Sequence, residues 1–280
     1  MIELDRAEFV AATATGTARV LHPITLRLTE RRIALIGANG SGKSTLARLL
    51  NGLIEPTAGT VRVAAADAMQ DSGRGSAPHS PGSTPPPAEP HWHDTVRDGA
   101  AVRRLVGFVF TDPAAQLVMP TSIEDVALSL RRSHPNKSDR LTAAREVLAG
   151  FGLEHLADRS VHTLSGGQRQ LLALASVLAT EPRILVADEP TTLLDLRNSR
   201  AIAERLFALP QQLIIATHDL ELAARCERVI VVEGGRVACD SAELGGTGQD
   251  STGQDSTGQD QASASAVRAA IAWYRESAEA

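Results

Sequence analysis

The stretch "RIALIGANGSGKSTLARLL" constrains the fold more than any other part of the chain, because an apolar run passes through glycines directly into a helical pattern. From Gly37 to Ser44 it matches the pattern G-x-x-x-x-G-K-[ST]. Glycines let backbone N–H groups turn inward around phosphate oxygens, and the start of a helix adds positive potential. A strand before the motif and a helix after it are the context that this motif requires. The sequence therefore predicts a phosphate-binding loop on an α/β fold.

The predicted loop assigns a chemical task to two of its side chains. We expect Lys43 to reach the β- and γ-phosphates of a nucleotide and the Ser44 hydroxyl to bind Mg²⁺. Average residue usage gives a chance match in about one in a hundred chains of this length, and the strand–loop–helix context makes it rarer. The residues expected to line the phosphates are Gly37, Ala38, Asn39, Gly40, Ser41, Gly42, Lys43, Ser44 and Thr45.

Composition excludes several classes of protein. The 280 residues are 43% apolar, which is enough for a core shared by one or two domains. A net charge of −5 with 3% aromatic residues argues against a nucleic-acid-binding surface. Two cysteines, Cys226 and Cys239, make no disulfide framework and favour a reduced, cytoplasmic setting.

A direct membrane attachment is also not expected. The N-terminus "MIELDRAEF" is charged and does not resemble a signal peptide. The longest apolar run, "LLALASVLA", is far shorter than the about 20 residues that a membrane span needs. If the protein serves a membrane, we expect a partner protein to provide the attachment.

The order of patterns along the chain predicts a parallel sheet with crossover helices, followed by a hairpin at Gly234-Gly235 in "RVIVVEGGRVACD". The segment at about 71–94, rich in Pro, Gly and Ser, predicts a disordered insertion, after which "RRLVGFVF" resumes the sheet. A repeated "TGQDS" predicts a disordered linker over 243–265. A short helix is expected over 266–280.

The short C-terminal helix carries an apolar face. Val267, Ile271 and Tyr274 recur at helical spacing. Such a face has to pack against something, and we expect it to dock on the chain's own domain rather than on a partner.

Two further motifs carry polar groups at element ends. "RILVADEP" places Asp188 and Glu189 at the end of a buried strand. "LSGGQ" places Leu164, Ser165, Gly166, Gly167 and Gln168 at the start of a helix, where hydroxyl and N–H groups face an anion. The chain already has one phosphate loop. A second phosphate-binding helix start is therefore expected to serve a nucleotide held by another subunit.

Taken in order, "GANGSGKST", "LSGGQ", "RILVADEP", "LLD" and "ATHD" resemble the ATP-binding-cassette ATPases over residues 1 to about 240. The resemblance implies a P-loop NTPase domain over 1–242, of fold class α/β. It implies a parallel-sheet core, an antiparallel β subdomain and a helical subdomain inserted at about 115–180. It also implies that the signature "LSGGQ" of one subunit closes on the phosphate loop of a second, with two ATP molecules between them.

The resemblance assigns roles to the acidic strand end and its neighbours. Asp188 is expected to hold Mg²⁺ through water, and Glu189 to act as the general base on the attacking water. His218 is expected to contact the γ-phosphate, and Asp195 to lie in the dimer-contact loop. Lone side chains of these types are more often structural, so the roles depend on the whole set.

The stretch "FTDPAAQLVMPT" departs from the family pattern. Energy-coupling-factor importers have the similar pattern F-Q-x-P-x-x-Q, whose first glutamine touches Mg²⁺ and the lytic water. Gln116 matches the second glutamine, but Thr111 stands in place of the first. Threonine is shorter, so we expect it to act through an added water, with slower turnover. The aromatic residue that stacks on adenine would align with Ala11, and Phe9 lies two residues earlier on the same strand face.

A histidine cluster admits two interpretations. His79, His91, His93 and Asp94 could bind a transition metal. The surrounding composition makes a solvated, non-binding segment the better prediction.

The resemblance predicts the ATPase of an energy-coupling-factor importer, most similar to the biotin-transport subunits. Cobalt, nickel or another vitamin is the alternative cargo. The expected partners are a second ATPase subunit, identical or homologous, a transmembrane coupling protein and a substrate-binding membrane protein, and no nucleic acid. The subunit would be peripheral on the inner face of the cell membrane. Two other classes stay open: a soluble cassette acting on ribosomes or DNA, and a non-hydrolytic nucleotide-binding regulator.

Overall fold

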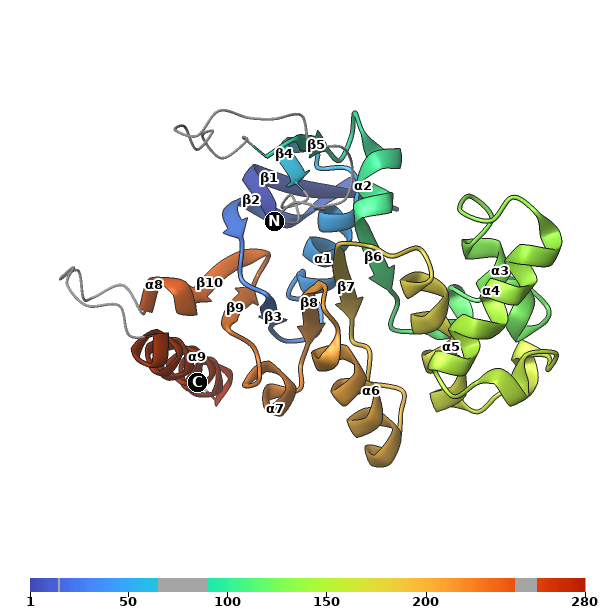
Figure 1. Ribbon diagram of the computed structural model, residues 1–280. Helices are drawn as coiled ribbons and strands as arrows, with labels where there is room; N and C mark the ends of the chain where they lie inside the picture. Colours follow the sequence, from blue (N-terminus) through green and yellow to red (C-terminus); the bar gives the residue numbers. More distant parts are fainter. Residues whose placement is uncertain (15, 65–89, 245–255, 280) are drawn as a thin grey trace, which may run out of the picture.

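The computed structural model describes residues 1–14, 16–64, 90–244 and 256–279, and within these a mostly parallel sheet forms the centre of the molecule (Figure 1). Its strand order is β10-β9-β3-β8-β7-β6. Strands β9, β3, β8, β7 and β6 run parallel, and β10 pairs with β9 antiparallel. The strands are β3 (Arg32–Ile36), β6 (Val106–Val109), β7 (Ile184–Asp188), β8 (Gln212–Thr217), β9 (Arg228–Glu233) and β10 (Arg236–Asp240).

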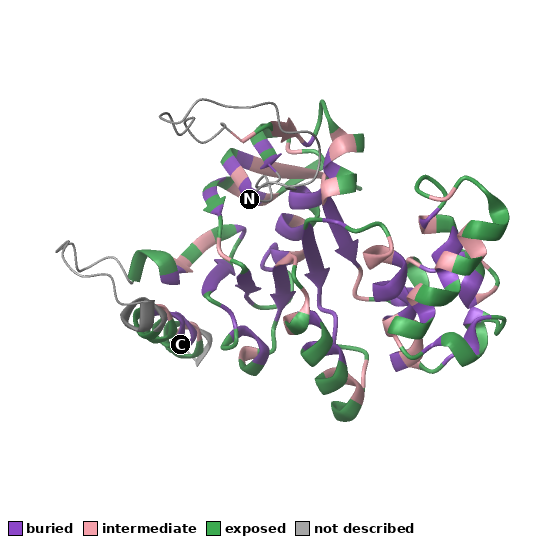
Figure 2. Cartoon of the chain, in the orientation of Figure 1, coloured by how far each residue is buried: buried purple, intermediate pink, exposed green. Residues whose placement is uncertain are grey.

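The central strands are buried on both faces, which explains their continuous apolar sequences. On β3, Ile33 and Leu35 point into one core cluster, whereas Ala34 and Ile36 point into another. Figure 2 shows buried residues concentrated along these strands, with the helices exposed on their outer sides. The sheet therefore holds the loops at its strand ends rigidly.

A second, antiparallel sheet packs against the face of the central sheet that carries Ile33 and Leu35. Its order is β2-β1-β4-β5, with β1 (Ile2–Thr13), β2 (Gly16–Leu28), β4 (Ala58–Ala64) and β5 (Trp92–Asp94). Helix α1 (Lys43–Asn51) lies between the two sheets, where Leu46, Leu49 and Leu50 are buried. The predicted combination of a parallel core and an antiparallel β subdomain is confirmed.

The boundary of the predicted insertion needs a correction. Strand β5 pairs with β4, so residues 92–94 belong to the antiparallel sheet and not to the insertion at about 71–94. Alternating side chains of "WHD" suit an edge strand, although the Pro-rich composition just before them hides this signal. Residues 71–89 of the predicted insertion lie outside the described residues.

The segment "RRLVGFVF" is also divided differently from the prediction. Helix α2 (Gly99–Leu105) includes its first three residues, and β6 begins only at Val106. Both elements are short, and periodicity over so few residues does not separate a strand from a helical turn.

The helices on the other side of the sheet form two groups. Helices α6 (Leu196–Ala208) and α7 (Leu220–Ala223) cover the sheet face that carries Leu185 and Ile215. Helices α3 (Ser122–Ser129), α4 (Lys137–Gly150) and α5 (Gly166–Leu178) form a subdomain with its own core cluster, beside β6 (Figure 1). Short 3₁₀ turns, η1 (Pro113–Ala115), η2 (Glu154–Leu156) and η3 (Val161–Thr163), connect them.

The C-terminal helix is longer than predicted. Helix α9 (Ser256–Glu279) begins within the stretch that composition assigned to a linker over 243–265. The short helix α8 (Ser241–Leu244) precedes it, and residues 245–255 lie outside the described residues. Val267 and Ile271 are buried, and Tyr274 packs beside them against β9 and α7, so the helix docks on its own domain as expected. Among the described residues, no helix is long and apolar enough to cross a membrane.

Candidate functional site

The phosphate loop lies between β3 and α1, as the sequence predicts. A Cβ atom added at Gly37 would lie 2.2 Å from the carbonyl oxygen of Val232, so only glycine lets the loop approach β9 this closely. Gly234 and Gly235 form the turn of the predicted hairpin with φ of +53° and +73°, values that favour glycine. The N–H of Gly235 donates to the Ser41 carbonyl at 2.9 Å, which fastens the hairpin turn to the loop.

The first acidic residue of "ADEP" faces the loop. Asp188 ends β7 and is 1% exposed, and the Ser44 hydroxyl donates to its Oδ1 at 2.7 Å. Burial raises the pKa of Asp188, and the hydrogen bond from Ser44 opposes that rise. The guanidinium of Arg48 lies 3.8 Å from Oδ2. Two oxygen groups that sequence reasoning assigned to a metal are therefore in contact with each other.

The second acidic residue lies between a cation and an imidazole. Glu189 Oε1 is 3.3 Å from Lys43 Nζ, and the two side chains are 10% and 5% exposed. Glu189 Oε2 is 2.8 Å from His218 Nδ1, and accepts a hydrogen bond from the Thr192 hydroxyl at 3.0 Å. The three residues predicted to be catalytic, Lys43, Glu189 and His218, are thus brought together from α1, the end of β7 and the end of β8.

The backbone at Glu189 is held in an uncommon conformation. Its φ is +48°, in the left-handed region that non-glycine residues rarely adopt. Its N–H donates to the Ala216 carbonyl at 2.8 Å, which fixes this turn to β8. A residue kept in such a conformation by its surroundings is typical of functional positions. The carboxylate is consequently directed at Lys43 and His218.

The loop after β6 uses Thr111 and Gln116 in different ways. The Thr111 hydroxyl donates to the backbone carbonyl of Asp188 at 3.0 Å. The Gln116 side chain accepts from the Phe110 N–H and donates to the Ala173 carbonyl on α5. Gln116 therefore joins the end of β6 to the helical subdomain. The Thr111 side chain contacts the end of β7 directly, at the backbone of Asp188.

The signature motif begins helix α5. The Ser165 hydroxyl accepts from the Gln168 N–H, and the Gln168 side chain accepts from the Ser165 N–H, which makes a capping box. Leu164 is buried in the core of the helical subdomain, Ser165 is exposed and Gly166 is partly buried. A Cβ at Gly167 would lie 2.7 Å from the Asn198 side chain, so this position needs glycine for close packing.

Asp195 connects the signature to the loop after β7. It caps α6, with Oδ1 accepting from the Asn198 N–H at 2.8 Å and Oδ2 from its side-chain amide at 2.8 Å. The hydrogen bond from the Asn198 backbone lowers the pKa of Asp195. Leu193 precedes Asp195 in this loop and Leu196 follows it, and the two side chains are 61% and 68% exposed. The predicted dimer-contact loop is thus an exposed apolar surface next to the signature helix.

The two remaining sequence predictions concern strand positions. Register shifts on both sides of Phe9 interrupt the alternation of β1, so the prediction that Phe9 and Ala11 share a face does not follow from their spacing. Phe9 also packs partly against the central core. His91 and His93 lie edge to face at 4.6 Å, whereas the Asp94 carboxylate accepts from the N–H groups of the next turn. Within the described residues no three metal-ligating side chains gather, and His79 lies outside them.

Sequence reasoning missed two residues that the structure places at the site, Thr192 and Asn198. Asn198 stands three residues after Asp195, which is the spacing of a helix N-cap and its N3 residue, so this contact could have been predicted. Thr192 carries no such signal. Only the turn at Glu189 brings its hydroxyl back to the carboxylate.

A model of the ABC transporter family matches residues 21–192, which is more than half of the chain. The chain belongs to the ABC transporter family. The matched range includes the phosphate loop, the signature and both acidic residues of the strand end. This cassette is accordingly an ATPase whose fold and motif order agree with the resemblance.

Similar curated proteins are transport subunits. The cassette is 45% identical to the biotin transport ATP-binding protein BioM of Rhizobium etli, over 83% of this chain and 92% of the relative. It is 41% identical to the nickel import ATP-binding protein NikO of Rhodobacter capsulatus, over 74% and 77%. It is 34% identical to the energy-coupling factor transporter ATP-binding protein EcfA1 of Halalkalibacterium halodurans, over 75% and 68%.

A solved structure resembles the cassette over most of its length. It is the dimeric, post-hydrolysis state of the ATP-binding cassette MJ0796 bound to ADP and phosphate. The TM-score is 0.67 with 26% identity, covering 86% of this chain and 97% of the other. The two chains therefore share the architecture of an ATP-binding cassette, and the solved one is a dimer with bound nucleotide.

Proposed function

We propose that this cassette hydrolyses ATP to drive an energy-coupling-factor importer that carries biotin. One observation carries the hydrolytic part: the buried Glu189 carboxylate lies between Lys43 Nζ and His218 Nδ1 at the end of the strand that follows the signature helix. The similarity to BioM and to EcfA1 supports the class of transporter and its cargo.

The proposed chemistry begins at Glu189. A carboxylate with one oxygen near an imidazole and the other near an ammonium group can accept a proton from water while its position is fixed by both neighbours. Lys43 is the group expected to leave Glu189 for the β- and γ-phosphates when ATP binds, because a trianionic phosphate chain attracts a cation more strongly than one carboxylate does. That exchange would free Glu189 Oε1 for the attacking water.

His218 and Thr192 would then keep the carboxylate in place. Both contact Oε2, the oxygen that does not face Lys43. His218 is also half-exposed, so its ring can reach a phosphate oxygen without leaving the end of β8. In this scheme Glu189 Oε1 accepts the proton from water, and the contacts at Oε2 fix the orientation of the carboxylate.

The residues expected to bind Mg²⁺ fit such an ion. Ser44 Oγ and an Asp188 carboxylate oxygen lie 2.7 Å apart, and hydroxyl and carboxylate oxygens are the ligands that Mg²⁺ prefers. Bound there, Mg²⁺ would neutralise charge on the phosphate oxygens. Thr111 would act on the same group indirectly, since its hydroxyl holds the Asp188 carbonyl.

We propose that a second subunit completes each site. Within one chain the signature residues contact the loop at 193–198 rather than the phosphate loop. Ser165 and Gly167 would therefore contact the nucleotide that is bound to a partner cassette. The dimeric MJ0796 structure supports this arrangement, and the second subunit is either a copy of this chain or a homologue.

The membrane components would be a transmembrane coupling protein and a substrate-binding membrane protein. The cassette would sit on the inner face of the cell membrane, attached through these partners. The resemblance to EcfA1 supports this assignment, because that protein is an energy-coupling factor transporter subunit.

Nickel or cobalt is the second candidate cargo, favoured by the 41% identity to NikO. The cargo does not contact this chain in either case, so the experiment has to be a transport assay. Cells that express the cassette with its membrane partners should accumulate labelled biotin, and cells with Glu189→Gln should not. Uptake of labelled nickel or cobalt instead of biotin would replace the proposed cargo, and uptake that survives Glu189→Gln would refute the proposed energy source.

The other two classes are less well supported. A regulator that binds nucleotide without hydrolysis has no need for a carboxylate aligned by both His218 and Thr192. A soluble cassette would not be expected to have transport subunits as its relatives over 74% or more of the chain.

A further inference from the structure

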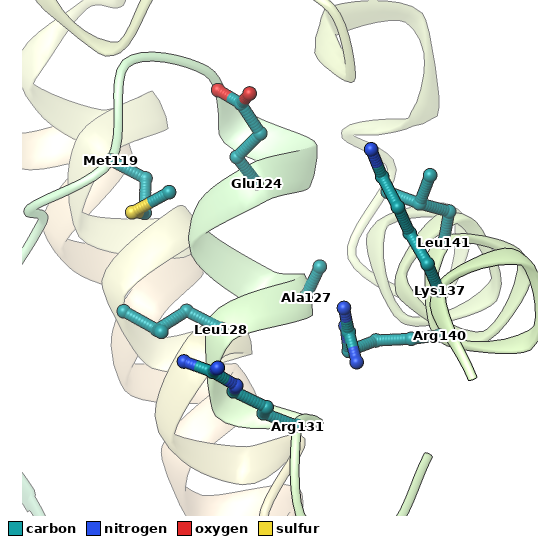
Figure 3. Close-up of a pocket in the computed structure, with 8 residues that line it drawn as sticks. All are labelled: Met119, Glu124, Ala127, Leu128, Arg131, Lys137, Arg140 and Leu141. Atoms are coloured by element: carbon teal, nitrogen blue, oxygen red, sulfur yellow. The ribbon is translucent and has the colours of Figure 1, made fainter. Parts of the chain in front are cut away.

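Helix α4 contacts different neighbours at its two ends. Figure 3 shows its start, where Lys137, Arg140 and Leu141 line one side of a hollow of about 270 Å³ and Ala127 and Leu128 of α3 line the other. This contact lies within the helical subdomain. The far end of α4 instead reaches α6, a helix that covers the central sheet, so it joins the subdomain to the rest of the chain.

A single guanidinium makes the polar part of the contact between α4 and α6. Arg205 of α6 donates from Nη1 to the carbonyl of Gly150 and from Nη2 to the carbonyl of Phe151, both at 3.4 Å. The last carbonyls of a helix need partners beyond its regular ladder, and those of residues 147–149 accept from the N–H groups of residues 151–153. Arg205 serves the next two carbonyls, and its positive charge suits the C-terminal end of the helix dipole.

The aromatic ring of Phe151 belongs to the same contact. Arg205 Cζ lies 5.4 Å from the ring centroid, within the range of a cation–π interaction. Phe151 packs against the core of the helical subdomain and also against the core beneath α6, as does Leu171 of α5. Arg205 itself is exposed, so replacing it opens no cavity and should cost little stability.

Helix α6 contacts the signature helix through the same face. Asn198 stands seven residues before Arg205, which is two helical turns, so both side chains lie on one face of α6. The Asn198 side chain lies against Gly167, 2.7 Å from the position of an added Cβ. One helix therefore contacts both the end of α4 and the start of α5, and it begins directly after Asp195. Losing the Arg205 contact should consequently let the signature move relative to the Asp195 loop.

We propose that Arg205 is a positioning residue for the signature: by binding the end of α4 it fixes the helical subdomain on α6, and so sets where Ser165 and Gly167 lie relative to the Asp195 loop. The inference rests on the proposed two-subunit site, since these groups would face a partner cassette. Arg205 lies near the end of α6 that is remote from Asp195. It should therefore affect the pairing of two cassettes and not the binding of nucleotide by one chain.

ATP-driven dimerisation measures this positioning. In the full chain with Glu189→Gln, we expect Arg205→Ala to raise the dissociation constant of the ATP-bound dimer by about 5- to 20-fold in analytical ultracentrifugation. The affinity of the single chain for ATP should stay within about twofold, because an exposed side chain far from the nucleotide is removed. Arg205→Lys keeps the charge but not the forked donor, so its dimer should have an intermediate dissociation constant.

A double-mutant cycle tests the contact itself. Phe151→Leu keeps an apolar side chain between the two cores but removes the ring. Because both changes act on one contact, Arg205→Ala with Phe151→Leu should weaken the dimer by less than the product of the two separate factors. Arg200→Ala, at another exposed position of α6, is the matched control and should leave the dimer unchanged.

Hydrogen exchange of the single chain separates positioning from general destabilisation. Arg205→Ala should speed amide exchange at residues 150–153 and in the signature at 164–168, and should leave the phosphate loop at 37–45 unchanged. Faster exchange in all three segments, or equal effects of Arg205→Ala and Arg200→Ala, would overturn the proposal. An ATP-bound dimer of Arg205→Ala as tight as that of the parent chain would overturn it as well.

The failure of this inference can be distinguished from failure of the proposed function. If the chain with Glu189→Gln alone forms no dimer with ATP, the proposed two-subunit site is wrong. The exchange experiment then still decides whether Arg205 positions the signature, because it needs no partner. If that dimer forms and Arg205→Ala leaves it intact, only the role of Arg205 is wrong.

Discussion

The sheet end that carries the phosphate loop and the helical subdomain that carries the signature satisfy their polar groups in opposite ways. At the sheet end, Asp188 and Glu189 are buried and each contacts side chains from other strands or helices of the same chain. Among the described residues of the helical subdomain, the side chains of Ser165 and Gln168 bond to each other's backbone, and no carboxylate lies within ion-pair distance of Arg131 or Lys137. The difference indicates that the acidic groups at the sheet end are already paired within the chain, whereas the polar groups of the helical subdomain have few partners among the described residues.

The prediction with the largest expected effect concerns Glu189 at the sheet end. Glu189→Gln keeps the size of the side chain and its contact with Thr192, but it removes the base. We expect ATP hydrolysis to fall by about 10²–10⁴-fold, since this is the usual contribution of a general base. ATP binding should persist, and the variant should accumulate as an ATP-bound dimer in size-exclusion chromatography. A variant that stays monomeric with ATP would contradict the two-subunit site.

The second prediction tests whether the signature of one subunit acts together with the phosphate loop of another. Lys43→Ala removes the phosphate contact, and Gly167→Val forces a side chain against Asn198, 2.7 Å from the position of a Cβ. Each variant alone should be inactive. A mixture of the two should regain ATPase activity, because a mixed dimer contains one intact pair of phosphate loop and signature. No regain on mixing, with both variants shown to dimerise, would argue that each chain works alone.

The third prediction compares two buried aspartates. Asp188 receives the Ser44 hydrogen bond, but Asp125 on α3 is 4% exposed and its Oδ2 has no partner among the described residues. Burial raises the pKa of Asp125 to about 6. Because the folded state then binds more protons than the unfolded state between about pH 4 and 6, the stability contributed by protonated Asp125 is lost as pH rises through this window.

Replacing Asp125 removes this cost. Asp125→Asn should raise the free energy of unfolding near pH 7.5 by about 1–2 kcal/mol, and by much less at pH 4. Urea unfolding at both pH values measures the difference. The matched variant Glu146→Gln, at an exposed position in the middle of α4, should change neither value. A destabilised Asp125→Asn at pH 7.5 would show that the carboxylate is satisfied in a way that the structure does not reveal.

The smallest expected effect concerns Thr192, which holds the same Glu189 oxygen as His218. Thr192→Ala removes one hydrogen bond to a charged group, so kcat should fall roughly 3- to 30-fold with little change in KM for ATP. Thr192→Ser retains the hydroxyl and should recover most of the rate. If both variants hydrolyse ATP at the original rate, Thr192 contacts Glu189 without positioning it.

Local sequence indicated which residues the structure gathers at the candidate site more closely than it indicated the element boundaries. The glycines and Lys43, the "ADEP" acids and the signature serine are consecutive in the sequence, and their chemistry depends on local geometry. Strand β5 depends instead on pairing with β4, and helix α9 packs against β9, so composition alone assigned residues of both to an insertion and a linker. Thr192 and the Thr111 contact with the Asp188 backbone could not be predicted, since the first requires the uncommon turn at Glu189 and the second requires the relative positions of the ends of β6 and β7.

The hydrogen bond from Gly235 to the Ser41 carbonyl has a consequence for the order of folding. It joins residues 194 positions apart. While the chain is still being synthesised, the residues of the phosphate loop are present long before the turn that braces them. The nascent chain should therefore acquire full affinity for nucleotide only after β9 and β10 have left the ribosome. Until then, ATP binding should not stabilise the partly folded cassette.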